Sequence, residues 1–240
     1  MNKDIIQMIS GPRNLSTALM YSFGNRSDVS PIDEPFYCHY LKKFNVDHPG
    51  RDEIIAEMET DPNKIIENIF SPKKDGSIRF IKNMAHHIKD LDWTKLFECP
   101  SFLLIRDTRK ILASFSKVIS KPTLEDIGVL EEWKVFQFLI DKGKKPCVLD
   151  SSLLLQNPES VLSQLCEDLQ IPFSDQMLKW EAGPRKEDGI WAKYWYGNTH
   201  KSTSFSIQKT SNDHIPTELK NVNEEAYFYY QKLLAHAIQP

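Results

Sequence analysis

The chain has 240 residues, of which 40% are hydrophobic, which suffices for one α/β domain with a continuous core. The formal net charge of -3 excludes a bulk electrostatic attraction to nucleic acid, so an anionic ligand must be held by local positive groups. No apolar run approaches the roughly 20 residues of a membrane span, and the cysteines form no zinc-binding pattern. We therefore expect a cytoplasmic protein with reduced thiols that binds no metal, membrane or nucleic acid.

Short apolar segments alternate with helical patterns along the chain. The predicted strands are 4–10, 28–33, 77–82, 101–105 and 146–150. The predicted helices are 16–23, a stretch after Glu34-Pro35, one beginning at Asp61-Pro62, 108–118, one from Thr123 to about Gly143, 158–169 and 223–238. This alternation predicts a three-layer α/β/α fold, with a central parallel sheet covered on both faces.

Residues 183–215 interrupt this alternation. They are rich in Gly, Trp, Tyr, His and Ser and have no clear period. We predict an irregular aromatic loop that serves as a lid or acceptor loop, followed by the final helix, within a single domain that spans 1–240.

The turn after the first predicted strand is the first candidate site. It consists of Gly11, Pro12, Arg13, Asn14, Leu15, Ser16 and Thr17. A helix N-terminus offers unpaired N–H groups and a positive dipole end, to which Ser16 and Thr17 add hydroxyls and Arg13 adds a guanidinium. These groups suit a phosphate or a sulfonate. A tight turn whose hydroxyls only cap the helix is the alternative.

Arg106 and Ser114 form the second candidate site. Arg106 directly follows the most convincing strand, 101–105, and Ser114 lies two turns into the next helix. Ligands of open α/β sheets bind beyond the carboxyl ends of the strands, so both residues are expected to share a cleft with the turn at 11–17.

Together the two motifs resemble those of the sulfotransferases that use 3′-phosphoadenosine 5′-phosphosulfate (PAPS), which have a P-loop NTPase-like fold. The family's loop P-[KR]-[ST]-G-[ST]-T is similar to 12–17 here, and its motif R-D-P-x-x-x-x-x-S to 106–114. Leu15 replaces the loop glycine, so a backbone with positive φ would be strained or absent there. Asn14 and Thr108 also depart from the pattern. The resemblance implies metal-independent transfer of a sulfuryl group from PAPS to a hydroxyl or amine of a small acceptor.

The resemblance implies roles for further residues. Arg13 and Lys82 would stabilise developing negative charge. Either Glu34 or one residue of the pair His86-His87 would remove the acceptor's proton, since adjacent histidines point in different directions and at most one is expected to face the site. Arg106 and Ser114 would bind the 3′-phosphate. Arg185 and Lys186 are similar to the family's C-terminal nucleotide clamp.

Two other functions stay open at this point. A nucleotide or small-molecule kinase would need magnesium beside the turn, and Asp150 is the candidate ligand, but the turn lacks the second glycine and the lysine of G-x-x-x-x-G-K-[ST]. A non-catalytic nucleotide-binding protein of the same fold is the other alternative. For His200, Ser202 and Thr203, local hydrogen bonds in a packed loop are expected rather than contacts with the acceptor.

Overall fold

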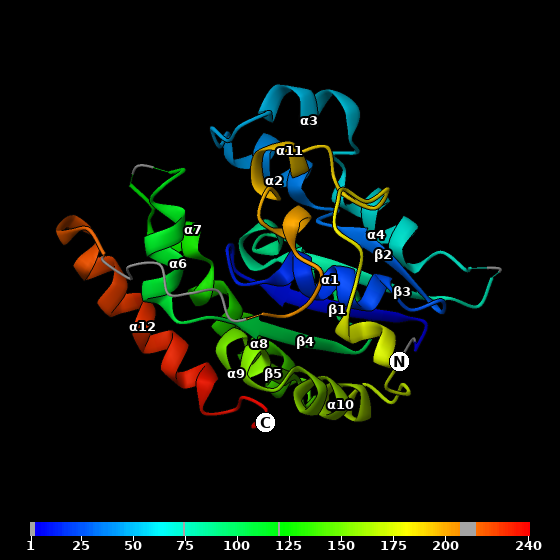
Figure 1. Cartoon of the computed structure of the whole chain (residues 1–240). Helices are drawn as coiled ribbons and strands as arrows, with labels where there is room; N and C mark the ends of the chain where they lie inside the picture. Colours follow the sequence, from blue (N-terminus) through cyan, green and yellow to red (C-terminus); the bar gives the residue numbers. More distant parts are fainter. Residues whose placement is uncertain (1–2, 74, 120, 207–214) are drawn as a thin grey trace.

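The computed structural model describes residues 3–73, 75–119, 121–206 and 215–240. Within these residues a five-stranded parallel sheet forms the centre, in the order β2-β3-β1-β4-β5 (Figure 1). The strands are β1 Ile5–Ser10, β2 Val29–Asp33, β3 Ile78–Met84, β4 Ser101–Ile105 and β5 Cys147–Asp150. All five strands were predicted within two residues at each end.

The central strand β1 separates the two halves of the sheet. It pairs with β3 from Ile5 to Ser10 and with β4 from Gln7 to Ser10, and all six of its residues are buried. The chain runs from β1 to the edge strand β2, returns to β3 beside β1, and then crosses to β4 on the other side. Such a change of direction leaves a crevice at the carboxyl ends of the strands, next to the turn that follows Ser10.

Helices cover both faces of this sheet (Figure 1). The helices are α1 Ser16–Gly24, α2 Tyr37–Phe44, α3 Arg51–Glu57, α4 Pro62–Phe70, α5 Trp93–Leu96, α6 Thr108–Phe115, α7 Leu124–Ile127, α8 Val129–Asp141, α9 Ser151–Gln156, α10 Pro158–Asp168, α11 Ala192–Trp195 and α12 Lys220–Leu234. Short 3-10 turns are η1 Ala85–Ile88, η2 Asp175–Leu178, η3 Thr199–Lys201 and η4 Thr217–Leu219.

Alternate residues of β1 divide the core into two layers. Ile5 and Ile9 pack with α4, α8 and α12 on one face, whereas Ile6 and Met8 pack with α1 and α10 on the other. This is the two-residue period of a strand that is buried on both faces. The predicted three-layer α/β/α architecture is therefore confirmed.

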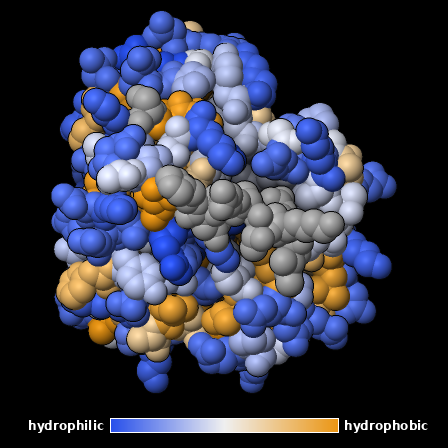
Figure 2. Space-filling model, turned by 60° about the vertical axis from the view of Figure 1, so that its left-hand side comes forward, coloured by the Kyte–Doolittle hydropathy of each residue, from blue (hydrophilic) through white to orange (hydrophobic). Residues whose placement is uncertain are grey.

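A third apolar cluster lies beyond the carboxyl edge of the sheet. It joins α2 and α3 to Trp191 and Tyr196, which flank α11 (Figure 1). The described part of the predicted loop 183–215 thus contains short helical turns and packs against α2. Residues 207–214 lie outside the described residues. None of the described helices is both long enough and apolar enough to span a membrane. Hydrophilic residues dominate the molecular face in Figure 2.

The helix boundaries differ from the sequence prediction in several places. The predicted helix from Thr123 to Gly143 is two helices, because Gly128 adopts a left-handed φ of 78° and ends the first. Thr123 does form the predicted capping box, with Asp126. The helix predicted at 108–118 ends at Phe115. The final helix is Lys220–Leu234 rather than 223–238. The short helices α3, α5 and α9 were not predicted.

Replacing Gly128 with alanine is expected to destabilise the fold. Left-handed φ costs a non-glycine residue about 1–3 kcal/mol, and a Cβ at 128 would also lie 3.2 Å from His86 Nδ1 and 3.4 Å from Gly11 Cα. Gly143→Ala is the control, because Gly143 has a φ of 72° with nothing within 4 Å of the added Cβ. Thermal unfolding should show a larger drop in Tm for Gly128→Ala than for Gly143→Ala. Equal drops would mean that the close contacts of the added Cβ with His86 and Gly11 do not add to the destabilisation.

Candidate active site

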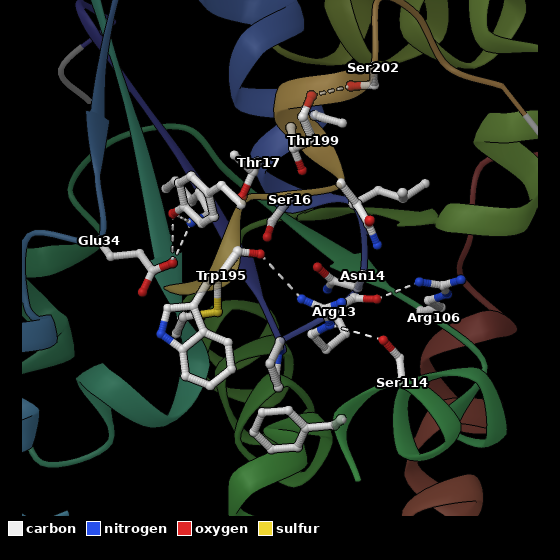
Figure 3. Close-up of a pocket in the computed structure, with 18 of the residues that line it drawn as sticks. Arg13, Asn14, Ser16, Thr17, Glu34, Arg106, Ser114, Trp195, Thr199 and Ser202 are labelled. Carbon is white, nitrogen blue, oxygen red and sulfur yellow. Dashed lines mark hydrogen bonds and ion pairs between the residues drawn. The ribbon is translucent and has the colours of Figure 1, made fainter. Parts of the chain in front are cut away.

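A cavity of about 310 Å³ opens at the carboxyl edge of the sheet (Figure 3). Its walls come from the turn after β1, the end of β3, η1, α6 and the segment 195–206. Most residues that the sequence singled out line it, namely Pro12, Arg13, Asn14, Leu15, Ser16, Thr17, Glu34, Lys82, His86, His87, Arg106 and Ser114. Gly11, Arg185 and Lys186 are outside its lining.

The backbone of the turn is shaped to bind an anion. Arg13 and Leu15 both have left-handed conformations, with φ of 61° and 73°. Left-handed residues between right-handed ones turn successive N–H groups toward a common point, which is the geometry of an anion-binding nest. Leu15 therefore adopts the conformation that the family's glycine would allow without strain.

The first turn of α1 adds further donors. The first intrahelical bond runs from Leu19 N to Leu15 O, at 2.9 Å. The N–H groups of Ser16, Thr17 and Ala18 precede it, so they have no partner within the helix, and all three residues line the cavity.

The carbonyl groups of the turn are held away from the cavity. Arg106 Nη1 donates to Arg13 O at 2.5 Å, and Ser151 Oγ donates to Asn14 O at 2.7 Å. Asn14 Nδ2 donates to Leu104 O at 2.5 Å. These bonds fix the turn to β4 and to the start of α9.

Gly11 packs closely against α7 and α8. Its N–H donates to Glu132 Oε1 at 2.8 Å, and an added Cβ would lie 2.5 Å from Ile127 O. Burial raises the pKa of Glu132 well above its usual value, although the bond from Gly11 lowers it in part. The glycine is needed for the close approach of α7 and α8 to the turn.

The two predicted anion sites meet through Arg13. Arg13 Nε donates to Ser114 Oγ at 3.0 Å, and Nη1 donates to Trp195 O at 3.4 Å (Figure 3). Burial lowers the pKa of Arg13 below its usual value. Since a guanidinium carries five N–H donors, these two contacts leave Arg13 able to bind an oxyanion as well. The sequence expectation that 11–17 and 106–114 share a cleft is confirmed.

Lys82 lies at the other end of the cavity, in a fully buried polar network. Its ammonium donates to Asp33 Oδ1 at 2.8 Å, to Tyr196 OH at 2.7 Å and to Glu34 Oε1. Burial lowers the pKa of Lys82, but the two carboxylates more than offset this and raise it overall. An ammonium has three protons, so none remains for a sulfuryl oxygen in this arrangement. The role of Lys82 as a charge-stabilising cation for the transferred group stays a prediction.

Glu34 extends from the end of β2 toward the cavity. It is buried and has a left-handed φ of 37°. Oε1 binds Lys82, whereas Oε2 lies 3.7 Å from His87 Nδ1. Burial raises the pKa of Glu34, Lys82 lowers it in part, and the nearby Asp33 raises it further. The outcome is a carboxylate with increased affinity for a proton.

Both histidines of η1 line the cavity, so the expectation that at most one would face it is wrong. Adjacent residues of a 3-10 helix are about 120° apart, and the two rings meet edge to face at 4.4 Å. Burial lowers the pKa of His86 to about 3 and that of His87 well below 6.5. In each ring, Nδ1 is buried without a hydrogen-bond partner among the described residues.

Sequence reasoning missed the aromatic wall. Tyr37, His48 and Trp195 line the cavity between Glu34 and the segment after α11. Tyr37 OH lies 2.9 Å from His48 Nδ1, and the Tyr37 ring stacks on His87 at 4.7 Å. The position of Tyr37 three residues after Glu34 was an available signal, whereas His48 lies in no motif.

The segment after α11 contributes polar residues as well. Ser202 lines the cavity, but its hydroxyl also donates to Thr199 O at 2.7 Å. His200 and Thr203 are outside the lining, and His200 Nε2 lies 3.0 Å from Asp188. The expectation of local hydrogen bonds is therefore met for Ser202 and His200.

The predicted nucleotide clamp lies elsewhere. Arg185 and Lys186 line a separate depression formed by Asn25 and residues 179–187. The Arg185 guanidinium packs over the Tyr21 ring at 4.4 Å, and its Nη1 donates to Tyr21 O at 3.4 Å. These contacts explain why Arg185 does not reach the turn at 11–17.

Both carboxylate oxygens of Asp150 accept hydrogen bonds from within the protein. Oδ1 accepts hydrogen bonds from Ser152 N at 2.8 Å and Leu153 N at 3.1 Å, which caps α9. Oδ2 accepts one from Tyr230 OH at 3.0 Å. Because Asp150 is also outside the cavity lining, the kinase alternative loses its candidate magnesium ligand.

The chain is thus a parallel three-layer α/β protein whose first strand leads through a turn with two left-handed residues into a helix at the cavity. A model of the family described as "Sulfotransferase domain" matches residues 4–237. The chain therefore belongs to the sulfotransferase family.

Two plant proteins are similar to the chain along nearly its whole length. It is 38% identical over 234 residues to "Branched-chain-amino-acid aminotransferase-like protein 2" of Arabidopsis thaliana. It is 36% identical over 241 residues to "Branched-chain-amino-acid aminotransferase-like protein 1" of the same plant. Each alignment covers 97% of this chain and 42% of the relative, so the chain spans less than half the length of these relatives.

Solved sulfotransferases share the fold. The sulfotransferase from Alicyclobacillus acidocaldarius superposes with a TM-score of 0.53 at 8% identity, covering 97% of this chain and 96% of that one. The sulfotransferase domain from the Curacin biosynthetic pathway superposes with a TM-score of 0.50 at 17% identity, covering 98% of each chain. At these identities the likeness concerns the fold alone.

Proposed function

We propose that the chain transfers a sulfuryl group from PAPS to a hydroxyl or amine of a small acceptor, within one domain that spans residues 1–240. The observation that carries the proposal is the shared cavity: the turn at 12–17, the pair Arg106 and Ser114, and the buried Glu34 all line it. The cavity therefore combines donors for two anionic groups with a proton acceptor.

The donor is proposed to lie along the turn. The 5′-phosphosulfate faces the N–H groups of the turn and of the first turn of α1. The 3′-phosphate lies near Arg106 and Ser114, at the ends of β4 and α6. Arg13 reaches from the first group to the second, since its Nε already contacts Ser114.

In the proposed step, the acceptor oxygen or nitrogen attacks sulfur in line with the bridging oxygen. The new bond to sulfur forms as the bond from sulfur to the 5′-phosphate oxygen breaks, and adenosine 3′,5′-bisphosphate leaves. The acceptor's proton goes to Glu34 Oε2.

Glu34 is the preferred base for a physical reason. Burial lowers the pKa of both His86 and His87, which makes each a weak base, whereas it raises the pKa of Glu34. A base is most effective when its pKa is close to the working pH. Arg13, which keeps donors for an oxyanion, is the proposed cation for charge on the sulfuryl group.

A thermal-shift titration tests the donor. We expect adenosine 3′,5′-bisphosphate to raise Tm increasingly with ligand excess, reaching about 2.7 kcal/mol of stabilisation at a hundredfold excess over Kd. Arg106→Ala should lose most of this shift, because it removes a cation at the proposed 3′-phosphate position. Arg109→Ala is the control, since Arg109 is outside the cavity lining. A response to ATP with magnesium alone would instead support a kinase.

A further inference from the structure

The hydroxyl of Tyr196 joins the segment after α11 to the ends of β2 and β3. It lies 2.7 Å from Asp33 Oδ2 and 3.3 Å from Glu34 Oε1. Lys82 Nζ donates to it at 2.7 Å and Trp191 Nε1 donates to it at 3.0 Å. Tyr196 itself is buried.

The donors and acceptors of this hydroxyl can be counted. A phenol has one proton and two lone pairs. Lys82 and Trp191 fill the lone pairs, so one proton remains for the carboxylates. It goes mainly to Asp33, whose oxygens lie 2.7 Å and 3.0 Å away, while Glu34 Oε1 at 3.3 Å is the weaker partner. Burial and both carboxylates raise the pKa of Tyr196 well above 10, which keeps this proton in place.

The two carboxylates are not equivalent. Asp33 receives bonds from Lys82, Tyr196 and, at 3.0 Å, Gly189 N, and it is outside the cavity lining. Glu34 is held at Oε1 only, and its Oε2 lies toward His87 and the cavity. One ammonium between two carboxylates leaves the pair with one net negative charge when both are ionised.

We propose that Tyr196 is a positioning residue for Glu34: it binds Asp33 and Lys82 and so orients the ammonium that holds Oε1, with a weaker contact of its own to Oε1, so that Oε2 is presented to the acceptor. Only the role of Glu34 as the base rests on the proposed function. Because a donor to a carboxylate favours its ionised form, Tyr196 also keeps Glu34 ready to accept a proton at lower pH. Tyr196 thereby joins the segment after α11 to β2 and β3 next to Glu34, the proposed proton acceptor.

Several other charged or titratable groups lie next to Glu34 or line the same cavity. They are Asp33 from β2, Lys82 from β3, His86 and His87 from η1, Tyr37 from α2, and, across the same cavity, His48 and Arg13. A test must therefore change Tyr196 and leave these groups in place.

Tyr196→Phe removes the hydroxyl and keeps the ring. The titration of Glu34 can be followed directly by NMR of protein labelled with ¹³C at glutamate Cδ, with Glu34→Gln identifying the signal. We expect the midpoint to rise by about one pH unit, because the variant loses a hydrogen bond that favours the ionised carboxylate. Tyr194→Phe is the matched control, since Tyr194 is 43% exposed on the same segment. It should leave the midpoint unchanged.

Asp33→Asn provides a second variant with the opposite expected sign. Asp33 raises the pKa of Glu34, so its neutral amide should lower the midpoint. A purely structural role of Tyr196 would lower Tm and leave the midpoint of Glu34 unchanged, and that result would overturn the proposal. Binding of adenosine 3′,5′-bisphosphate to the same samples is scored separately. Its absence from the wild type would count against the proposed function while the titration still decides the role of Tyr196.

Discussion

Glu34→Gln should lower the rate of sulfuryl transfer by about 10²- to 10⁴-fold and leave the binding of adenosine 3′,5′-bisphosphate unchanged. The glutamine oxygen can keep the contact with Lys82, but the amide cannot take up the acceptor's proton. The measurement is release of the bisphosphate from PAPS, using whichever small alcohol or amine gives the fastest wild-type release.

The control for this substitution is another buried glutamate. Glu131 is buried on α8, pairs with Lys134 at 2.8 Å and is outside the cavity lining. Glu131→Gln should therefore leave turnover unchanged. If Glu34→Gln kept its activity and His87→Ala lost it, the base would be the histidine instead.

The pH dependence of turnover gives an independent check on Glu34. Burial raises its pKa above 4.5, so the carboxylate should become available as a base only at a pH above that value. The rate constant is then expected to rise with pH through this raised pKa. A profile that already reaches its plateau at pH 4.5 would contradict the assignment.

The sheet and the anion-binding turn could be predicted from local sequence. Each strand is a short apolar run that ends at polar or turn residues, and parallel strands bring their following turns to one edge. The hydrogen bond from Arg106 to Arg13 joins two residues that are 93 positions apart in the sequence. They meet because β1 and β4 are adjacent in the sheet. The sequence pattern therefore predicted where the turn at 11–17 and Arg106 lie relative to each other.

The acidic end of the site was less predictable. Lys82 and Glu34 were singled out, but Tyr196, which joins their buried network, lies 114 residues after Lys82. The segment 183–206 has no clear hydrophobic period, so its sequence does not indicate that Tyr196 turns inward. In the same way, the packing of Arg185 on Tyr21 is a tertiary contact that no local pattern signals. Gly128 ended a helix because its left-handed φ outweighed the continuous apolar period around it.

The two ends of the cavity use different physical means. The donor end relies on backbone N–H groups that the fold fixes in place, which lose little entropy when an anion binds. The acceptor end relies on buried charge, which is costly unless it is paired. Lys82 supplies that pairing, so its importance is expected to show in stability as well as in activity.

Lys82→Met is accordingly expected to reduce the free energy of unfolding by about 3–5 kcal/mol, since removing one partner leaves buried charge uncompensated. Urea denaturation measures this as a lower midpoint with little change in slope. Lys193→Met is the matched control, because its ion pair with Glu53 joins two side chains that are 52% and 40% exposed. It should leave the free energy of unfolding almost unchanged.

The loss should also depend on pH in a defined direction. Lys82 lowers the pKa of Glu34, so the variant raises that pKa further above the 4.5 of the unfolded chain. A carboxyl with a raised pKa in the folded state stabilises the fold below 4.5, and this stabilisation is lost as the pH rises through the folded pKa. The gap between variant and wild type should thus be smallest in acid and widen toward neutral pH. Adding Glu34→Gln to Lys82→Met should recover part of the loss at neutral pH, because it removes one of the two stranded charges. If the difference in unfolding free energy between Lys82→Met and the wild type does not vary with pH, and the double variant is no more stable than Lys82→Met, the buried carboxylates are not the cause of the lost stability.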